Sequence, residues 1–131
     1  MTDSKNPRAI ALAYLDAAGR KDFQAFETLL APDVTFRGPA ATLSGARNVA
    51  AAYARFAPIL VQNELKKVFV DANDVCLIYD FVTDTPAGAV PTVEWLAIED
   101  GLVRSIWLVT DHVRWPAALE ELGRRAARKV P

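Results

Sequence analysis

The chain has 131 residues, of which 52% are hydrophobic and 24% are charged, and this length is typical of one domain. The formal net charge of −1 provides no field that would attract nucleic acid or an anionic membrane surface. The single cysteine, Cys76, excludes an internal disulfide, and a single histidine, His112, cannot build the usual Cys/His zinc sites. The apolar run over residues 9–15 is too short to span a bilayer. We therefore expect one soluble, cytoplasmic domain over residues 1–131, with no bound metal.

The first residues with clear periodicity predict a helix hairpin. Asn6 and Pro7 are a typical N-cap and first helical residue, and apolar residues then recur at helical spacing until Gly19. Asp22 can cap a second, short helix that ends at Pro32. Because only a few residues join the two helices, we expect them to pack against each other.

A short strand and a third helix follow in the sequence. Residues 34–36 predict the strand, which Gly38 and Pro39 end. Ser44 can cap a third helix that carries Tyr53 and Phe56 and ends at Pro58.

The second half of the chain changes from helical to alternating hydrophobicity. Strands are predicted over residues 65–70, 75–83, 92–98 and 103–110, with short turns between them. Such neighbours form a mostly antiparallel sheet. Trp115 and Pro116 begin a last helix with favourable Glu120/Arg124 and Glu121/Arg125 pairs. The expected class is α+β, with a core over residues 7–115 and a C-terminal helix over residues 116–129.

Three short segments border the predicted elements: Asp33-Val34-Thr35-Phe36, Leu43-Ser44-Gly45 and Glu99-Asp100-Gly101-Leu102-Val103. Together with the helix hairpin and the strand meander, they resemble the nuclear transport factor 2-like superfamily. The resemblance is strongest to its SnoaL-like branch, with the ketosteroid isomerases, polyketide cyclases and limonene epoxide hydrolases. It implies a cone-shaped domain in which N-terminal helices cover the concave face of a curved sheet and enclose an apolar pocket. It also implies a homodimer through the convex face, and the superfamily includes both enzymes and binding modules.

The turn of the last hairpin decides which side chains face inward, because a shift of one residue exchanges the two faces of a strand. A two-residue turn at Asp100-Gly101 would place Glu94 on one face with Val103 and Trp107. A three-residue turn with a glycine bulge would place Glu94 with Ile106 and Leu108. We favour the second register, because it resembles the register of related proteins. It groups aliphatic side chains inward and leaves Trp95 and Trp107 outside, where they suit a dimer interface.

By resemblance, Tyr14 and Glu94 lie where ketosteroid isomerases place a tyrosine and a protonated aspartate that donate to the substrate oxygen. A carboxyl group in an apolar cavity is disfavoured in its charged form, so Glu94 can stay neutral and donate a hydrogen bond. Gly38 stands at the position of the isomerase's general base. The isomerase reaction therefore does not transfer to this chain. Tyr14 also fits a packing role on its helix.

Asp80 matches one catalytic aspartate of the epoxide hydrolases, whereas Ile78 and Leu108 replace their arginine and second aspartate. No complete catalytic set of a known family is present. If Asp80 and Glu94 face each other across a hairpin, their Cβ atoms lie about 4.5–5.5 Å apart and the two carboxyls titrate as a coupled acid/base pair. The alternative is an Asp80 satisfied by an arginine such as Arg104.

We therefore expect a cofactor-independent enzyme of isomerase, cyclase or hydrolase type, acting on a small apolar oxygenated molecule with Glu94, Asp80 and Tyr14 as catalytic residues. The predicted substrate-binding residues are Tyr53, Phe56, Asp84, Leu96, Ile106 and Leu108, although Asp84 also suits a turn. The alternative function is a non-catalytic dimeric module that binds a ligand or assists a partner.

Overall fold

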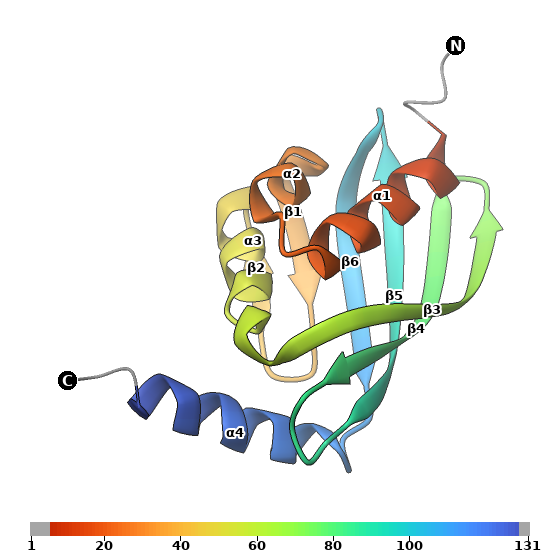
Figure 1. The fold of residues 1–131 in the computed structure, drawn as a ribbon. Helices are drawn as coiled ribbons and strands as arrows, with labels where there is room; N and C mark the ends of the chain where they lie inside the picture. The colour runs from red at the N-terminus through yellow and green to blue at the C-terminus, as the bar shows by residue number, and fades with distance from the viewer. Residues whose placement is uncertain (1–5, 129–131) are drawn as a thin grey trace.

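The computed structural model describes residues 6–128 (Figure 1). In chain order the elements are α1 Pro7–Gly19, α2 Phe23–Thr28, β1 Leu30–Arg37, β2 Thr42–Ser44, α3 Ala46–Ala54, the 3-10 helix η2 Ala57–Ile59, β3 Leu60–Asp71, β4 Asp74–Thr83, β5 Ala89–Glu99, β6 Leu102–Thr110 and α4 Trp115–Arg128. The predicted helices and strands occur in the predicted order, but the structure adds the short strand β2 and the 3-10 helix η2, which were not predicted. The strands β3 and β5 are longer than their predicted ranges, and the position 129 assigned to the last helix lies outside the described residues.

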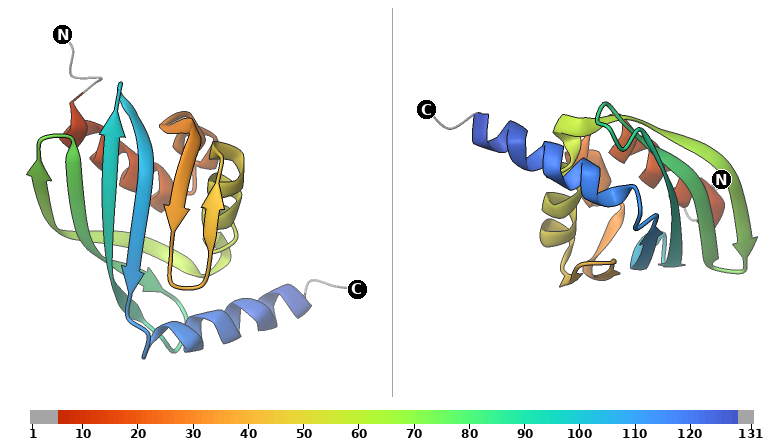
Figure 2. Two further views of the ribbon diagram at one scale, coloured as in Figure 1. Left: turned by 180° about the vertical axis from the view of Figure 1, so that it is seen from behind. Right: turned by 90° about the horizontal axis from the view of Figure 1, so that it is seen from below.

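Within the described residues, six strands form one curved sheet in the order β2-β1-β6-β5-β4-β3. All neighbouring strands are antiparallel except β1 and β6, which are parallel. The helices α1, α2 and α3 cover one face, and α4 lies beyond the end of β6 (Figure 1). Figure 2 shows that none of the helices within residues 6–128 covers the opposite face. The α+β class with helices on the concave face is therefore confirmed.

Local side-chain caps fix the first two helices. The Oδ1 atom of Asn6 accepts a hydrogen bond from the backbone of Ala9 at 3.1 Å, and Asp22 caps α2 in the same way. The predicted end of α2 at Pro32 is wrong, because Pro32 lies inside β1. It stands where the register between β1 and β6 shifts, a place where a missing N–H is tolerated.

The predicted cap at Ser44 is also wrong. Ser44 ends β2, and Gly45 is the N-cap of α3 without a side-chain hydrogen bond. Its φ of 95° lies in the region that favours glycine. The third helix is shorter than predicted, because it ends at Ala54 and leaves Phe56 outside.

The last hairpin places Glu94 opposite Leu108, on the face that we favoured. The turn that we favoured is wrong. It has two residues, Asp100 and Gly101, both with positive φ, as a type I′ turn requires. The register changes further along, where an extra residue, Arg104, forms a β-bulge in β6.

Aromatic rings build the core between the helices and the sheet. The buried ring of Phe26 lies 4.7 Å from that of Tyr14 and 4.8 Å from that of Tyr53, measured between centroids. A second, smaller apolar cluster joins η2, β5 and α4 through Ile59, Val90 and Leu122. This second cluster attaches α4 to the domain.

Candidate functional site

A cavity of about 410 Å³ lies between the concave face of the sheet, α3 and the start of α4. This volume is in the range that holds a small molecule. Its walls are formed by Ala18, Phe23, Phe36, Gly38, Pro39, Ala40, Ala41, Leu43, Ala52, Tyr53, Arg55, Phe56, Leu60, Asn63, Tyr79, Phe81, Thr92, Glu94, Leu108, Thr110, Trp115 and Leu119. Among residues 6–128, Glu94 and Arg55 are the charged residues in these walls.

The carboxyl group of Glu94 is fully buried and bound by three tyrosines. Strand β5 places Glu94 between Leu77 and Leu108 of the neighbouring strands. Its Oε1 atom lies 2.5 Å from the hydroxyl of Tyr14 and 2.8 Å from that of Tyr53, while Tyr79 donates to Oε2. The hydroxyls of Tyr14 and Tyr53 also lie 2.8 Å apart. The four side chains form one connected network.

Burial controls the electrostatics of this network. Desolvation raises the pKa of Glu94, although hydrogen bonds from Tyr14, Tyr79 and Tyr53 oppose this effect. Desolvation raises the pKa of each tyrosine well above its ordinary value, and ionisation of Glu94 would raise it further. The tyrosines therefore remain protonated donors at neutral pH.

The number of hydrogen bonds in the network indicates whether Glu94 carries a proton. There are four short oxygen–oxygen contacts, and the three hydroxyl groups supply three protons. With an ionised Glu94, the contact between Tyr14 and Tyr53 would have no proton if both donate to the carboxylate. A neutral carboxyl supplies the fourth proton, and Glu94, Tyr53 and Tyr14 can then donate around a closed ring. The geometry and the direction of the pKa shift both favour a neutral Glu94.

The structure brings several predicted site residues to the cavity. Tyr53, Phe56, Leu108 and Glu94 lie in its walls. Tyr14 is fully buried and lies outside the lining, so its hydroxyl contacts Glu94 and Tyr53 instead of the cavity. Its place in the network is that of a support for Glu94.

The predicted pairing of Asp80 with Glu94 is wrong. Asp80 lies opposite Pro91, and Glu94 lies opposite Leu77. Successive side chains of a strand point to opposite faces, so Asp80 lies on the outer face of the sheet. There its carboxylate is 3.7 Å from the ammonium group of Lys66, whereas Arg104 pairs with Asp33 and Glu99.

Three predicted substrate-binding residues lie elsewhere. Leu96 and Ile106 face each other across β5 and β6 in the buried core and are not part of the cavity wall. Asp84 is exposed in the loop after β4, where its carboxylate lies 2.8 Å from the guanidinium of Arg125. These placements correct the prediction.

Sequence reasoning missed Tyr79, which lines the cavity and binds Glu94. The signal was present in the alternation of β4, because Val75, Leu77 and Tyr79 share the buried face. Asp80, the next residue along β4, lies on the opposite face of the sheet.

The helix α4 closes one side of the cavity with Trp115 and Leu119. The ring of Trp115 packs against those of Phe56 and Phe81, at centroid distances of 5.2 and 5.8 Å. Further along the helix, Arg125 holds α4 to the body of the domain.

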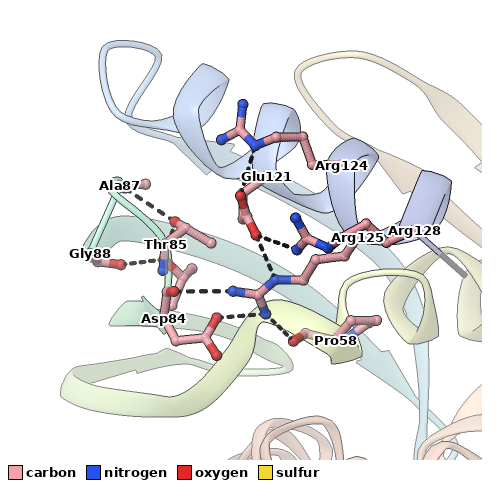
Figure 3. Close-up of polar contacts among 10 residues, drawn as sticks. Pro58, Asp84, Thr85, Ala87, Gly88, Glu121, Arg124, Arg125 and Arg128 are labelled. Atoms are coloured by element: carbon pink, nitrogen blue, oxygen red, sulfur yellow. Dashed lines mark hydrogen bonds and ion pairs between the residues drawn. The ribbon is translucent and has the colours of Figure 1, made fainter.

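Arg125 donates to the backbone oxygen of Pro58 at 2.7 Å and to the backbone oxygen of Asp84 at 3.2 Å. Figure 3 shows the guanidinium of Arg125 between these two backbone oxygens and the carboxylate of Glu121, which it contacts at 2.9 Å. Hydrogen bonds from Arg125 and Arg124 lower the pKa of Glu121 to about 2. Arg125 therefore connects α4 to Pro58 and to the loop after β4.

Gly38, at the position of the general base in ketosteroid isomerases, lies in the cavity wall. A Cβ atom at this position would be 2.7 Å from the ring of Phe36. The packing of Phe36 therefore leaves no room for a carboxylate side chain here.

Solved structures of similar fold include a protein of Kribbella flavida that is 29% identical, with a TM-score of 0.76 over 93% of this chain and 95% of that one. A nuclear transport factor 2-like protein of unknown function from Cytophaga hutchinsonii is 24% identical, with a TM-score of 0.70 over 80% and 89% of the two chains. A candidate ketosteroid isomerase of Kribbella flavida is 22% identical, with a TM-score of 0.72 over 86% and 82%.

No curated protein matches the sequence. No helix among residues 6–128 has the length and hydropathy needed to cross a membrane. The model of the SnoaL-like domain matches residues 11–106, which include the helices over the sheet and the network around Glu94. The chain therefore belongs to the SnoaL-like domain family.

Proposed function

We propose that this protein is an enzyme of isomerase, cyclase or hydrolase type that acts on a small, largely apolar molecule with a carbonyl-type oxygen. The observation that carries the proposal is a buried Glu94 carboxyl, bound by three tyrosines, at the wall of an apolar cavity. The similarity in fold to a candidate ketosteroid isomerase agrees with it.

Tyr53 is the member of the network best placed to touch a ligand. It is only partly buried and lines the cavity, whereas Tyr14 and Glu94 have no exposed surface. A ligand oxygen can accept a hydrogen bond from the Tyr53 hydroxyl in place of Tyr14. A protonated Glu94 then donates its own hydrogen bond to the Tyr53 oxygen. Negative charge that develops on the ligand oxygen is then stabilised by Tyr53, with Glu94 polarising that hydroxyl from behind.

The cavity offers no second acid or base of the kind that we expected from Asp80. Among residues 6–128, Glu94 is the only carboxylate in the walls, and no histidine lies there. This observation supports the alternative function, a module that binds such a ligand without converting it. It also favours reactions in which stabilisation of charge on the oxygen carries most of the catalysis.

Exchange of hydrogen for deuterium at the α-carbon of 1-tetralone tests the proposal. In D₂O, water accepts the α-proton, the charge on the enolate oxygen is stabilised by Tyr53, and a solvent deuteron then adds to the carbon. We expect the wild type to accelerate the exchange, measured by proton NMR. Because one oxyanion donor contributes about 10²–10³ in rate, we expect Tyr53→Phe to lose most of the acceleration and Glu94→Gln to lose part of it.

Asp80→Asn is the matched control, because Asp80 lies on the outer face. It should exchange deuterium at the wild-type rate. Binding of tetralone without any acceleration over buffer would contradict the enzyme and support the binding module. Absence of both binding and exchange would contradict both functions for this class of ligand.

A further inference from the structure

Asn63 is a polar residue in the cavity wall that neither the fold nor the Glu94 network explains. It lies on β3 opposite Phe81, whose ring also lines the cavity. The Oδ1 atom of Asn63 is buried and accepts no hydrogen bond from any residue among 6–128.

A buried carbonyl oxygen without a donor reduces stability. Rotation about the terminal torsion of the side chain turns this oxygen toward the cavity that Asn63 lines, where a group from outside the chain can bind it. That group is either water or part of a ligand. A ligand that displaces the water has to reproduce its hydrogen bond, or it loses affinity. In both cases the amide selects for ligands with a suitable polar group.

The position of Asn63 separates it from the Glu94 network. Asn63 lies opposite Phe81, and Leu65 lies opposite Tyr79, so Asn63 and Tyr79 are diagonal neighbours. Their side chains start about 7–8 Å apart. The amide of Asn63 and the Glu94 network therefore lie at separate places in the cavity wall.

A hydroxyl group matches this amide best. The terminal torsion of an asparagine is broad, so the side chain can turn either its oxygen or its nitrogen to the cavity. A hydroxyl group can donate to the oxygen and accept from the nitrogen, whereas a carbonyl or an ether can only accept.

We propose that Asn63 binds a hydroxyl group of the ligand, and that the substrates of this site are hydroxylated cyclic ketones. This assignment rests on the proposed function, because it takes the ketone oxygen to lie at Tyr53. The hydroxyl group then lies across the cavity at Asn63.

Binding of 6-hydroxy-1-tetralone and 6-methoxy-1-tetralone, measured by tryptophan fluorescence, tests the assignment. The two probes differ in the ability to donate at one position. We expect the wild type to bind the hydroxy compound about tenfold more tightly, as one hydrogen bond allows. In Asn63→Leu this preference should disappear, and in Glu94→Gln it should persist.

Gln62→Leu is the matched control, because Gln62 is exposed and lies outside the cavity wall. It should keep the preference. We also expect Asn63→Leu to unfold at the same or a higher urea concentration than the wild type, because an apolar replacement removes an unsatisfied group.

Equal affinity of the wild type for the two probes would overturn the assignment of Asn63 while leaving the proposed function intact. The same conclusion follows if Asn63→Leu keeps the preference, or if it unfolds at clearly lower urea concentration. Failure of the wild type to bind either tetralone would overturn the proposed function together with this assignment.

Discussion

Replacement of Glu94 by glutamine should remove a pH dependence of stability that the wild type shows. Glutamine has nearly the same shape and can keep the tyrosine partners of Glu94, but it cannot ionise. At pH 4, where an exposed carboxyl is also largely protonated, we expect the free energies of unfolding of the two proteins to agree within about 1 kcal/mol.

The difference should grow as the pH rises. Desolvation raises the pKa of Glu94 in the folded protein above that in the unfolded chain. Between these two pKa values the folded state holds a proton that the unfolded state has released, so the free energy of unfolding falls with increasing pH. A single group gives a slope of at most about 1.4 kcal/mol per pH unit. The wild type should follow this slope in addition to that of its other groups, whereas Glu94→Gln should not.

Urea denaturation followed by tryptophan fluorescence, from pH 4 to pH 8, measures both curves. Subtraction of one curve from the other cancels the contributions of the other titrating groups. A difference that stays constant over this range would show that Glu94 titrates alike in both states. A wild type that gains stability relative to Glu94→Gln as the pH rises would show that the network holds an ionised carboxylate, and the proton count would be wrong.

Three further predictions concern other parts of the molecule. Arg125→Met should lower the Tm and increase deuterium exchange of α4 amides, because it removes the bonds to Pro58 and Asp84; an equal effect of Arg124→Met, whose ion pairs with Glu120 and Glu121 lie within α4, would argue against this anchor. Gly38→Ala should cost about 1–3 kcal/mol of unfolding free energy through overpacking against Phe36, whereas Gly123→Ala, with open space around its Cβ, should stabilise by about 0.5–1 kcal/mol. We propose that the uncovered face of the sheet forms a homodimer through Trp95 and Trp107, which are 47% and 39% exposed; light scattering should show a wild-type dimer that Trp95→Glu dissociates, and a monomeric wild type would contradict the proposal.

The sequence predicts best what depends on neighbouring residues. The caps at Asn6 and Asp22 were predicted correctly, because each bonds a backbone N–H three residues away. The prediction of an N-cap at Ser44 was wrong, because Ser44 belongs to the short strand β2, which pairs with β1. The pairing partner lies in another element and leaves no local signal.

The candidate site shows the same limit over longer distances. Asp80 pairs with Pro91, three residues from the position that a pairing with Glu94 requires, and an odd shift moves a side chain to the other face. The β4–β5 loop sets this shift, and its length was not evident from the sequence. The partners of Glu94 come from α1, α3 and β4 and are 15 to 80 residues away in the chain.

The bulge at Arg104 changes the phase of alternation along β6. Before it Val103 is buried, and after it Ile106 is buried, so inward positions change from odd to even numbers. Without this extra residue, burial of Val103 would turn Trp107 toward the helices, where an indole would occupy much of the space now open beside Glu94. Instead Trp107 lies outside beneath the guanidinium of Arg37, 4.1 Å from its ring centroid. Deletion of Arg104 would therefore place the Trp107 ring inside the cavity and remove it from the outer face of the sheet.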